Sequence, residues 1–287
     1  LEFATNHLSK LQDVKANISE SELSIPSEFQ VAWQEFKKSN ILKYLIPKQY
    51  GGDGLPKTVS TAVKEALIAS NPSFYIYVML NLEAAGLIEK FGTKNQNKQY
   101  CQKLYNLEWS GALSYTEAQA DCEWDAIETY ATPEGNSYSI TGQKSLVAAG
   151  MHGLTQNIVH LVLAKLEISG EKDALAWFIV PQNLDENGKP ISNNITVESC
   201  QKPVGLEGVP FCTLNFGNAG TTKGELLCKT GDGAEDLYQY LNGVRFETSL
   251  QSVALSNLVL QQVTKFACAE KRTISPLEGA SNKRPSI

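Results

Sequence analysis

The sequence predicts an α+β protein in which a helical segment, a β-rich segment and a second helical segment follow one another. Three observations predict this order. Apolar residues recur at helical spacing from Leu8 to about Leu107, short β-branched runs separated by Gly, Pro and Asn follow Trp109, and helical spacing returns after Gly231. With 287 residues, of which 42% are apolar and 20% charged, the chain is expected to be globular.

Residues 1–108 are expected to form an N-terminal α-helical domain. Apolar residues at helical spacing include Val31, Trp33 and Phe36, and then Val59, Val63 and Leu67. The stretch IPKQYGGDGLP interrupts this spacing. Its glycine pair resembles a phosphate-binding loop, but the Lys-Ser/Thr that would hold phosphate and metal is missing, so we expect a turn between helices.

Residues 109–228 are expected to form a middle antiparallel β-domain. The runs YSITG, NIVHLVLAKL, ALAWFIVP, NITVESC and CTLNFG are short, rich in β-branched residues and bounded by turn formers. The segment NLDENGKPISNN lies between two of them and contains Asn187-Gly188. Because this pair is a strong turn signal, we expect it at the tip of a long hairpin.

Residues 229–287 are expected to begin a C-terminal α-helical domain made of one or two long helices. Apolar residues at helix-compatible intervals are Leu237, Leu241, Val244, Val253, Leu260, Val263 and Phe266. A single amphipathic helix has little stability without packing. Its apolar faces must therefore meet the first domain, another chain, or a part of the polypeptide that this sequence does not contain.

Charge and composition disfavour several classes of function. The 25 Lys and Arg against 31 Asp and Glu give a net charge of -6, so a nucleic-acid partner is not expected. No stretch approaches the roughly 18 to 20 apolar residues that span a bilayer, and the start LEFATNHLSK does not resemble a secretion signal. We therefore expect a soluble, cytoplasmic protein with no membrane partner.

The motifs of several common chemistries are missing. The 6 cysteines lie far apart in the sequence and only 3 histidines accompany them, so no metal site is expected and the thiols are expected to be reduced. No GxGxxG follows a strand, and neither a P-loop nor a GxSxG elbow occurs. The helix, sheet, helix order leaves the cleft between domains as the default ligand site.

The order of four segments is more specific than any single motif. They are LIPKQYGGDGLPKTVSTAVKEALIASNPSF, EWSGALSYTEAQADCEWDAIETYATPEGNSYSITGQKSLVAAGMHGLTQNIVHLVLAK, QKPVGLEGVPFCTLNFGNAGTTKGELL and GDGAEDLYQYLNGVRFETSLQSVALS. In this order they resemble the acyl-CoA dehydrogenase superfamily. The chain is most similar to the 3-methylmercaptopropionyl-CoA dehydrogenase-like subgroup, in GGxGLPK, NIVHLVLA, DENGKPISNN and LNGVR. The resemblance runs from about Val31 to Lys271.

The resemblance implies a fold and an activity. The fold is an N-terminal helical domain, a middle β-barrel domain and a C-terminal helical bundle that is incomplete in this sequence. The implied activity is α,β-dehydrogenation of an acyl-CoA thioester to enoyl-CoA with FAD as cofactor. In that reaction a carboxylate base takes the α-proton and the β-hydrogen leaves as hydride to the flavin. A homo-oligomer, dimer or tetramer, is implied as well.

The resemblance also assigns cofactor-binding residues. Thr116 matches the threonine that hydrogen-bonds the flavin ring, and the backbone of Leu113 and Tyr115 occupies the positions that face it. The family's aromatic-Ile-Thr tripeptide, which stacks on the flavin and donates a hydroxyl group to it, begins with Leu146 and ends with Ala148 in this chain. The aromatic surface and the hydroxyl group are both missing.

Three residues match substrate-binding positions. Arg245 matches the arginine beside the CoA moiety, and Asn242 lies one turn earlier. Cys122 replaces the serine that contacts ligand and cofactor. Asp121 replaces a glycine in the same loop and would add negative charge near the expected pyrophosphate, which is electrostatically unfavourable.

The catalytic base is not identified. In this subgroup the catalytic glutamate lies later in the bundle, so the base is expected beyond Ile287, and Val244 occupies the position that some relatives use instead. Glu247 lies three residues further and is expected to point elsewhere on a helix of about 3.6 residues per turn. Two hypotheses stay open: the enzyme, or a catalytically silent scaffold with a degraded FAD site that binds an acyl-CoA or a protein partner.

Overall fold

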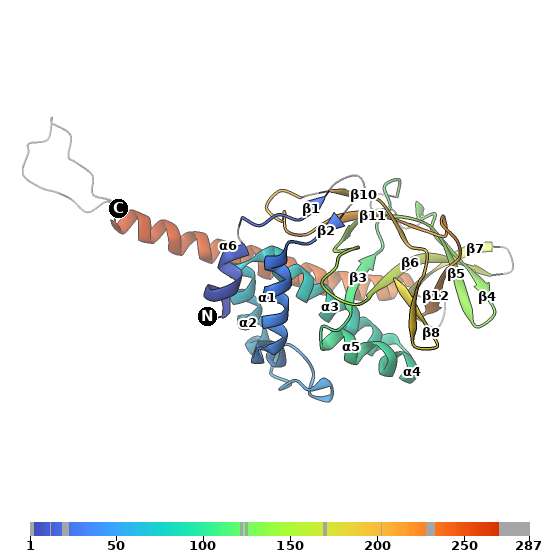
Figure 1. The fold of residues 1–287 in the computed structure, drawn as a ribbon, viewed down its shortest axis with the longest axis horizontal. Helices are drawn as coiled ribbons and strands as arrows, with labels where there is room; N and C mark the ends of the chain where they lie inside the picture. The colour runs from blue at the N-terminus through green and yellow to red at the C-terminus, as the bar shows by residue number, and fades with distance from the viewer. Residues whose placement is uncertain are drawn as a thin grey trace, which may run out of the picture.

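Helices precede and follow a β-rich part (Figure 1). The computed structural model describes residues 3–11, 13–18, 23–120, 123, 126–168, 171–201, 203–227 and 233–269. The observed order of helices, strands and helix confirms the α+β fold class that the sequence predicts.

The first helical part contains short turns and three longer helices. Its first elements are η1 (Ala4–Leu8), η2 (Ser9–Leu11), β1 (Asn17–Ile18), β2 (Leu23–Ser24) and α1 (Ser27–Lys38). The later ones are η3 (Asn40–Tyr44), η4 (Lys48–Tyr50), α2 (Lys57–Ser70), α3 (Pro72–Phe91), α4 (Lys94–Gln96), η5 (Asn97–Cys101) and α5 (Gln102–Tyr105). The sequence did not predict the antiparallel β1–β2 pair, because strands of two residues show no alternation.

The glycine-rich stretch is the predicted turn, and it lies between η4 and α2. Gly51 has a φ of 92° and Gly54 a φ of 58°, so both adopt the left-handed conformation that favours glycine. The backbone N–H of Gly52 donates to the carbonyl oxygen of Pro47 at 3.1 Å. The chain then continues into α2, which packs against α3.

Helix α3 is the most buried helix of the first part. Its N-terminus is capped by Asn71, whose Oδ1 accepts from the backbone N–H of Phe74 at 2.8 Å, and Pro72 occupies a first-turn position that needs no donor. Apolar residues surround most of the helix, so it lies between the other helices and the sheet (Figure 1). Neither α3 nor any other helix in the described ranges has the length and apolar character needed to cross a membrane.

Among the described residues, eight strands form one sheet. They are β3 (Ser110–Ser114), β4 (Tyr130–Glu134), β5 (Ser137–Ala148), β6 (Ile158–Ile168), β7 (Glu171–Pro181), β10 (Thr196–Gln201), β11 (Phe211–Phe216) and β12 (Thr222–Leu226). Their order is β10-β11-β5-β12-β7-β6-β3, and β4 pairs with both β5 and β6. The pairings are antiparallel, as expected, except that β3 and β4 run parallel to β6.

The remaining two strands form the predicted hairpin. Strands β8 (Asn183–Glu186) and β9 (Lys189–Ser192) are joined by Asn187 and Gly188, whose φ values are 55° and 78°. Positive φ at both central residues is what a type I′ turn requires. Asp185 Oδ1 accepts from the backbone N–H of Gly188 at 2.7 Å and closes the tip.

Two groups of buried apolar side chains hold these elements together. The first joins the helices to one side of the sheet and includes Trp33, Phe74, Ile88, Leu161 and Trp177. The second lies among the strands and includes Ile140, Val162, Phe178, Leu214 and Phe216. Because the first group contains residues of both parts, the helices and the sheet are packed into one body.

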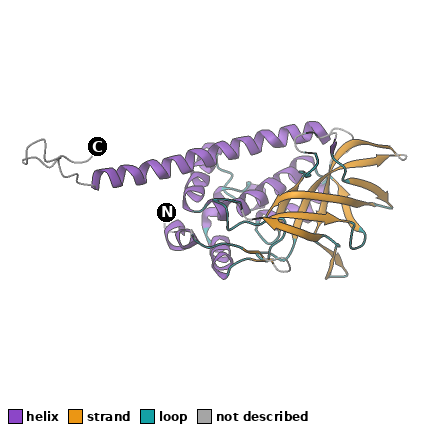
Figure 2. Ribbon diagram, turned by 90° about the horizontal axis from the view of Figure 1, so that it is seen from above, coloured by secondary structure: helices purple, strands orange, loops and turns teal. Residues whose placement is uncertain are grey.

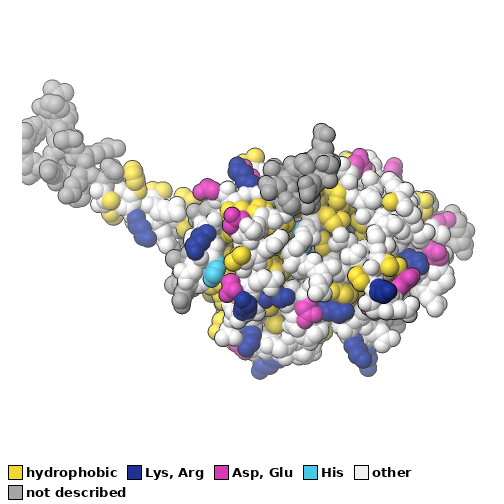
Figure 3. Space-filling model, viewed as in Figure 1, with side chains coloured by type: hydrophobic (Ala, Val, Ile, Leu, Met, Phe, Trp, Pro, Cys, Tyr) yellow, Lys and Arg dark blue, Asp and Glu magenta, His cyan; other side chains and the backbone are white. Residues whose placement is uncertain are grey.

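Helix α6 (Gly233–Ala269) is a single helix of 37 residues. It packs against α2 and β7, and Leu250 and Ala254 are buried in that contact region. Its C-terminal end projects beyond the other helices, where hydrophobic side chains lie at the surface (Figures 2 and 3). Among the described side chains of the helix, the exposed large apolar residues are Phe246, Val253, Leu255, Val259, Leu260, Val263 and Phe266.

In α1 and α2, two valines at helical spacing do not lie on the buried faces of their helices. Val31 is 58% exposed and Val59 is 45% exposed, whereas Trp33 and Phe36 on α1 are fully buried. Val59 lies in the first turn of α2, where the helix begins at Lys57. Spacing therefore identified the helices correctly but not every residue of their buried faces.

Candidate functional site

The structure brings the two predicted cofactor-binding segments together. The chain leaves β3 at Ser114 and runs along the end of β5, where the backbone N–H of Ser145 donates to the carbonyl oxygen of Thr116 at 2.9 Å. The ammonium group of Lys144 approaches the carbonyl oxygen of Tyr115 at 3.5 Å. Residues 113–116 and 146–148 therefore lie on neighbouring segments, although about thirty positions separate them in the sequence.

The five predicted cofactor-binding residues differ in exposure. Leu113 is buried, Tyr115, Thr116 and Ala148 are half-buried, and Leu146 is 53% exposed. Leu146 also has a φ of 54°, a left-handed conformation that costs on the order of 1 kcal/mol in a residue other than glycine. The strained residue thus presents an apolar side chain to the surface beside Thr116.

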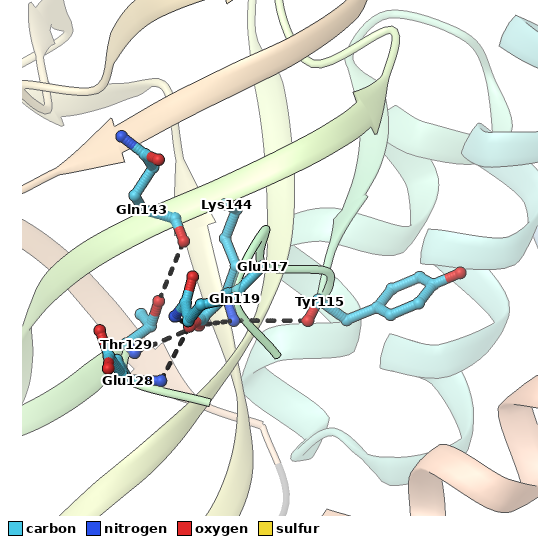
Figure 4. A network of polar contacts seen from close by, with 7 residues as sticks. All are labelled: Tyr115, Glu117, Gln119, Glu128, Thr129, Gln143 and Lys144. Carbon is cyan, nitrogen blue, oxygen red and sulfur yellow. Dashed lines mark hydrogen bonds and ion pairs between the residues drawn. The ribbon is translucent and has the colours of Figure 1, made fainter. Parts of the chain in front are cut away.

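A buried ion pair fixes these segments (Figure 4). Lys144 Nζ lies 2.6 Å from Glu117 Oε1, and the two side chains are 0% and 1% exposed. Glu117 also accepts from the backbone N–H groups of Glu128 at 2.8 Å and Thr129 at 3.2 Å, and from the Gln119 amide at 2.6 Å. One carboxylate therefore joins the segment after β3, the end of β5 and the segment before β4.

The environment changes the pKa of both members of the pair. Burial alone would raise the pKa of Glu117, but the charge of Lys144 and the backbone N–H of Glu128 hold it below its usual range. Burial lowers the pKa of Lys144 to about 8, against the opposing charge of Glu117. The pair is charged near neutral pH, and its hydrogen bonds offset the cost of burying two charges.

The sequence prediction missed this ion pair. Glu117 belongs to the segment SYTEAQA and Lys144 to the segment TGQKSLVA, and nothing in either segment indicates that they meet. Lys144 stands between the polar residues Gln143 and Ser145, so apolar spacing gives no signal for it either. Only the register of β5 shows that Lys144 faces the interior.

The predicted substrate-binding residues lie elsewhere, on α6. Asn242 and Arg245 are exposed, and Arg245 Nη1 donates to Asn242 Oδ1 at 3.2 Å. Cys122 and Asp121 lie outside the described residues, so their predicted positions near the ligand stay predictions.

A cavity of about 770 Å³ opens between α2, α3 and α6. Asn242 is one of its lining residues, and none of the five predicted cofactor-binding residues is. Its apolar walls come from Leu45, Ile46, Leu55, Leu82, Leu87, Phe91 and Phe246. Its charged lining residues are Lys57, Lys64, Glu83, Lys90 and Glu247.

Glu247 is held at one side of this cavity by two partners. Its side chain is 5% exposed, it forms an ion pair with Lys64 of α2, and its Oε2 accepts from the Tyr75 hydroxyl at 2.6 Å. Burial and the charge of Glu247 raise the pKa of Tyr75. Glu247 thus joins α6 to α2 and α3, and the expectation that it is not the catalytic base stays a prediction.

The comparisons with known proteins show a resemblance to acyl-CoA dehydrogenases. Residues 2–108 match the model of the acyl-CoA dehydrogenase N-terminal domain. The chain is 27% identical over 279 residues to 3-methylmercaptopropionyl-CoA dehydrogenase of Ruegeria pomeroyi, an alignment that covers 96% of this chain. The chain is therefore similar to acyl-CoA dehydrogenases along most of its length. The predicted resemblance to this family and subgroup is confirmed.

Solved structures show the same acyl-CoA dehydrogenase fold. Butyryl-CoA dehydrogenase from Megasphaera elsdenii superposes with a TM-score of 0.74 at 18% identity, covering 96% of this chain and 68% of that one. An acyl-CoA dehydrogenase from Bacillus anthracis, complexed with FAD, gives a TM-score of 0.72 at 21% identity, covering 88% of this chain and 41% of that one. The predicted fold is confirmed.

The chain spans only part of the length of its curated relatives. The alignment covers 47% of the Ruegeria pomeroyi enzyme, and 38% of the broad-specificity linear acyl-CoA dehydrogenase FadE5 of Mycobacterium tuberculosis, to which the chain is 27% identical over 237 residues. Activity and substrate are properties of those whole proteins, so for this chain they are matters of proposal.

The side chains of residues 113–116 and 146–148 are suited to a flavin ring. The exposed side chain of Leu146 offers an apolar surface to a flat ring, and half-buried Thr116 keeps a hydroxyl donor next to it. Ala148 has no hydroxyl group to add a second donor. The surface therefore suits the flat ring but offers it fewer hydrogen bonds than the family pattern does.

Proposed function

We propose that this protein is an FAD-dependent acyl-CoA dehydrogenase that oxidises an acyl-CoA thioester to the 2,3-enoyl-CoA. The observation that carries the proposal is the meeting of residues 113–116 with residues 146–148 at the ends of β3 and β5. The similarity over 96% of the chain to 3-methylmercaptopropionyl-CoA dehydrogenase supports it.

In this proposal the chain's residues hold the cofactor and one end of the substrate. The hydroxyl of Thr116 and the backbone of Leu113 and Tyr115 face the flavin ring, while Leu146 and Ala148 pack against it. A bound FAD supplies the acceptor for the hydride that leaves the β-carbon. The Glu117–Lys144 ion pair keeps both segments in place before the ligands bind.

The CoA end of the substrate is assigned to α6. Arg245 and Asn242 are exposed one turn apart and offer charged and neutral donors to the CoA moiety. Cys122 is proposed to contact ligand and cofactor, as the family pattern implies. The base that takes the α-proton is proposed to lie beyond Ile287, since Glu247 is engaged by Lys64 and Tyr75.

Flavin absorption tests the proposal directly. Purified full-length protein, with the segment proposed to carry the base, should show the flavin bands and should bleach when an acyl-CoA is added without oxygen, whereas residues 1–287 alone should not turn over an acyl-CoA. Thr116→Val should reduce FAD retention, whereas Thr221→Val, in an exposed loop, should leave it unchanged. Colourless protein that takes up no added FAD would contradict the proposal and would favour a catalytically silent scaffold, which the similarity to dehydrogenases does not favour.

We further infer a homo-oligomer, dimer or tetramer, that acts in the cytoplasm on an acyl-CoA substrate. Exposed apolar side chains on α6, such as Leu260 and Phe266, support association with another surface. The domain division proposed is 1–108, 109–228 and 229–287. Sedimentation velocity tests the assembly, because a concentration-independent monomer would contradict it.

A further inference from the structure

The cavity between α2, α3 and α6 contains a carboxylate for which the described residues provide no hydrogen-bond or ion-pair partner. It belongs to Glu83 of α3, which lines the cavity. A methyl group added at Gly243 of α6 would lie 3.8 Å from Glu83 Oε2, so the carboxylate points across the cavity toward α6. It is therefore available to a ligand.

Glu83 is one of two carboxylates in a lining that also contains Lys57, Lys64 and Lys90. Glu247 and Lys64 neutralise one another in their ion pair, and Glu83 adds a second carboxylate beside them. Burial raises the pKa of Glu83 and the charge of Glu247 raises it further, while Lys64 and Lys57 act in the opposite direction. A half-buried carboxylate in this position gains most from a hydrogen-bond donor, above all a cationic one.

The remaining lining suits the methylene groups of an acyl chain. Leu82 and Leu87 of α3 and Phe246 of α6 line the same cavity as Glu83. Asn242, which the proposed function places beside the CoA moiety, also lines it. A ligand held at Asn242 can thus extend along an apolar wall toward a polar end at Glu83.

We propose that this cavity receives the far end of the acyl group, and that Glu83 selects acyl groups ending in a hydrogen-bond donor, an ammonium or a hydroxyl group, over those ending in a methyl group. This inference rests on the proposed function. It names Glu83 as a specificity-determining residue and amino- or hydroxy-terminated acyl-CoA thioesters as the substrate class.

Calorimetric titration of the native protein tests the inference. The ligands are CoA thioesters of matched length that end in a methyl, a hydroxyl or an ammonium group. The ammonium ligand should bind at least about tenfold more tightly than the methyl ligand, as one charge-assisted hydrogen bond implies, with the hydroxyl ligand between them. Glu83→Leu should reverse this order, because the apolar side chain removes the acceptor.

A conservative variant and a control complete the test. Glu83→Gln keeps the size and one acceptor, so it should keep the hydroxyl preference and lose the ammonium preference. Glu65→Gln should change nothing, because Glu65 of α2 accepts from Asn257 at 2.9 Å and does not line the cavity.

Three results would overturn the inference. Native protein that bleaches with thioesters but binds all three end groups equally would overturn the role of Glu83 and leave the proposed function standing. Native protein that binds none of the thioesters would contradict both. A Glu83→Gln variant that keeps the full ammonium preference would also exclude Glu83 as the selecting residue.

Discussion

At the scale of the residue, Lys144 shows how a charged side chain can belong to the interior of a strand. Its ammonium group has no access to solvent, and Glu117 supplies the opposite charge at 2.6 Å. Burying two charges is expensive, and the pair persists because backbone N–H groups of the segment before β4 also bind the carboxylate. The pair therefore connects three segments: the one after β3, the end of β5 and the one before β4.

Lys144→Met is expected to lower the free energy of unfolding by about 3 to 5 kcal/mol, because it leaves Glu117 as an unpaired buried carboxylate. Urea unfolding followed by circular dichroism measures the loss. Pairing Lys144→Met with Glu117→Gln should recover part of it. Lys15→Met, which removes an exposed ion pair with Glu207, should have little effect. Equal losses for the two lysine variants would mean that burial of the pair does not matter.

A second prediction concerns the surface beside Thr116. The pair Leu146→Phe and Ala148→Thr restores a ring and a hydroxyl group, so FAD should be retained about tenfold more tightly, from one stacking contact and one hydrogen bond. Equilibrium dialysis against FAD gives the affinity. The control is Ile191→Phe, which adds a ring to the exposed hairpin instead. Unchanged retention in the double variant would show that this surface does not contact the flavin.

The family resemblance selected single residues, but it did not predict which side chains from other elements lie next to one another. It selected Thr116 and Leu146, which the structure places on neighbouring segments. It did not indicate that Glu83, Glu247 and Lys64 would line one cavity, because these residues belong to three helices whose relative rotation depends on packing. Patterns of apolar spacing report a helix face, but not which polar group of another helix lies opposite.

At the scale of the element, the contact between α3 and β3 determines where the cofactor-binding segment begins. The amide of Asn81 donates to the carbonyl oxygen of Trp109 at 3.0 Å and accepts from the backbone N–H of Gly111 at 2.9 Å. Strand β3 can lie this close to α3 because Gly111 has no side chain. A Cβ at Gly111 would lie 2.4 Å from the Cβ of Ala84.

Gly111→Ala is therefore expected to destabilise the protein by about 1 to 3 kcal/mol through overpacking, since the neighbouring atoms belong to a helix backbone and a short side chain. Gly153→Ala is the matched control, because its added methyl group would meet no atom within 4 Å. Thermal unfolding of both variants measures the difference. A Gly111→Ala protein as stable as the control would mean that β3 and α3 separate without cost.

Periodicity predicted which helices and strands are present more reliably than it predicted which strands pair with one another. The long helical pattern after Gly231 is one helix, α6, and the Asn187-Gly188 turn is the tip of the β8–β9 hairpin. The parallel pairing of β3 with β6 could not be predicted, because β3 and β6 are separated by β4 and β5 in the sequence. The division of the chain into three domains stays a prediction.

At the scale of the whole molecule, α6 contacts both the first helical part and the sheet. It packs against α2 and β7, lines the cavity through Asn242 and Phe246, and is joined to α2 and α3 by Glu247. Its later turns, with exposed Leu260 and Phe266, extend past these contacts (Figure 2). The helix thus stabilises the described body with one half and offers an apolar surface with the other.

Two buried histidines connect the stability of the whole molecule to pH. His152 lies edge-on to the Tyr77 ring, with 5.2 Å between centroids, and His160 of β6 lies near Phe216 at 6.1 Å. Within the described residues, neither Nε2 atom has a hydrogen-bond partner. Burial lowers the pKa of each to about 3 from the ordinary 6.5, and the neighbouring His160 adds to the shift of His152.

The sign of the pH dependence follows from these values. Between pH 6.5 and about 3 the unfolded chain binds protons that the folded protein does not, so the free energy of unfolding should fall as the pH is lowered, by about 1.4 kcal/mol per pH unit for each histidine. Urea unfolding at several pH values measures the slope. His160→Leu should reduce the slope by the contribution of one histidine, about 1.4 kcal/mol per pH unit. Above pH 7 both histidines are neutral in either state, so the variant and the native protein should show the same slope there. A slope unaffected by His160→Leu below pH 6 would show that this imidazole is not kept neutral by the fold.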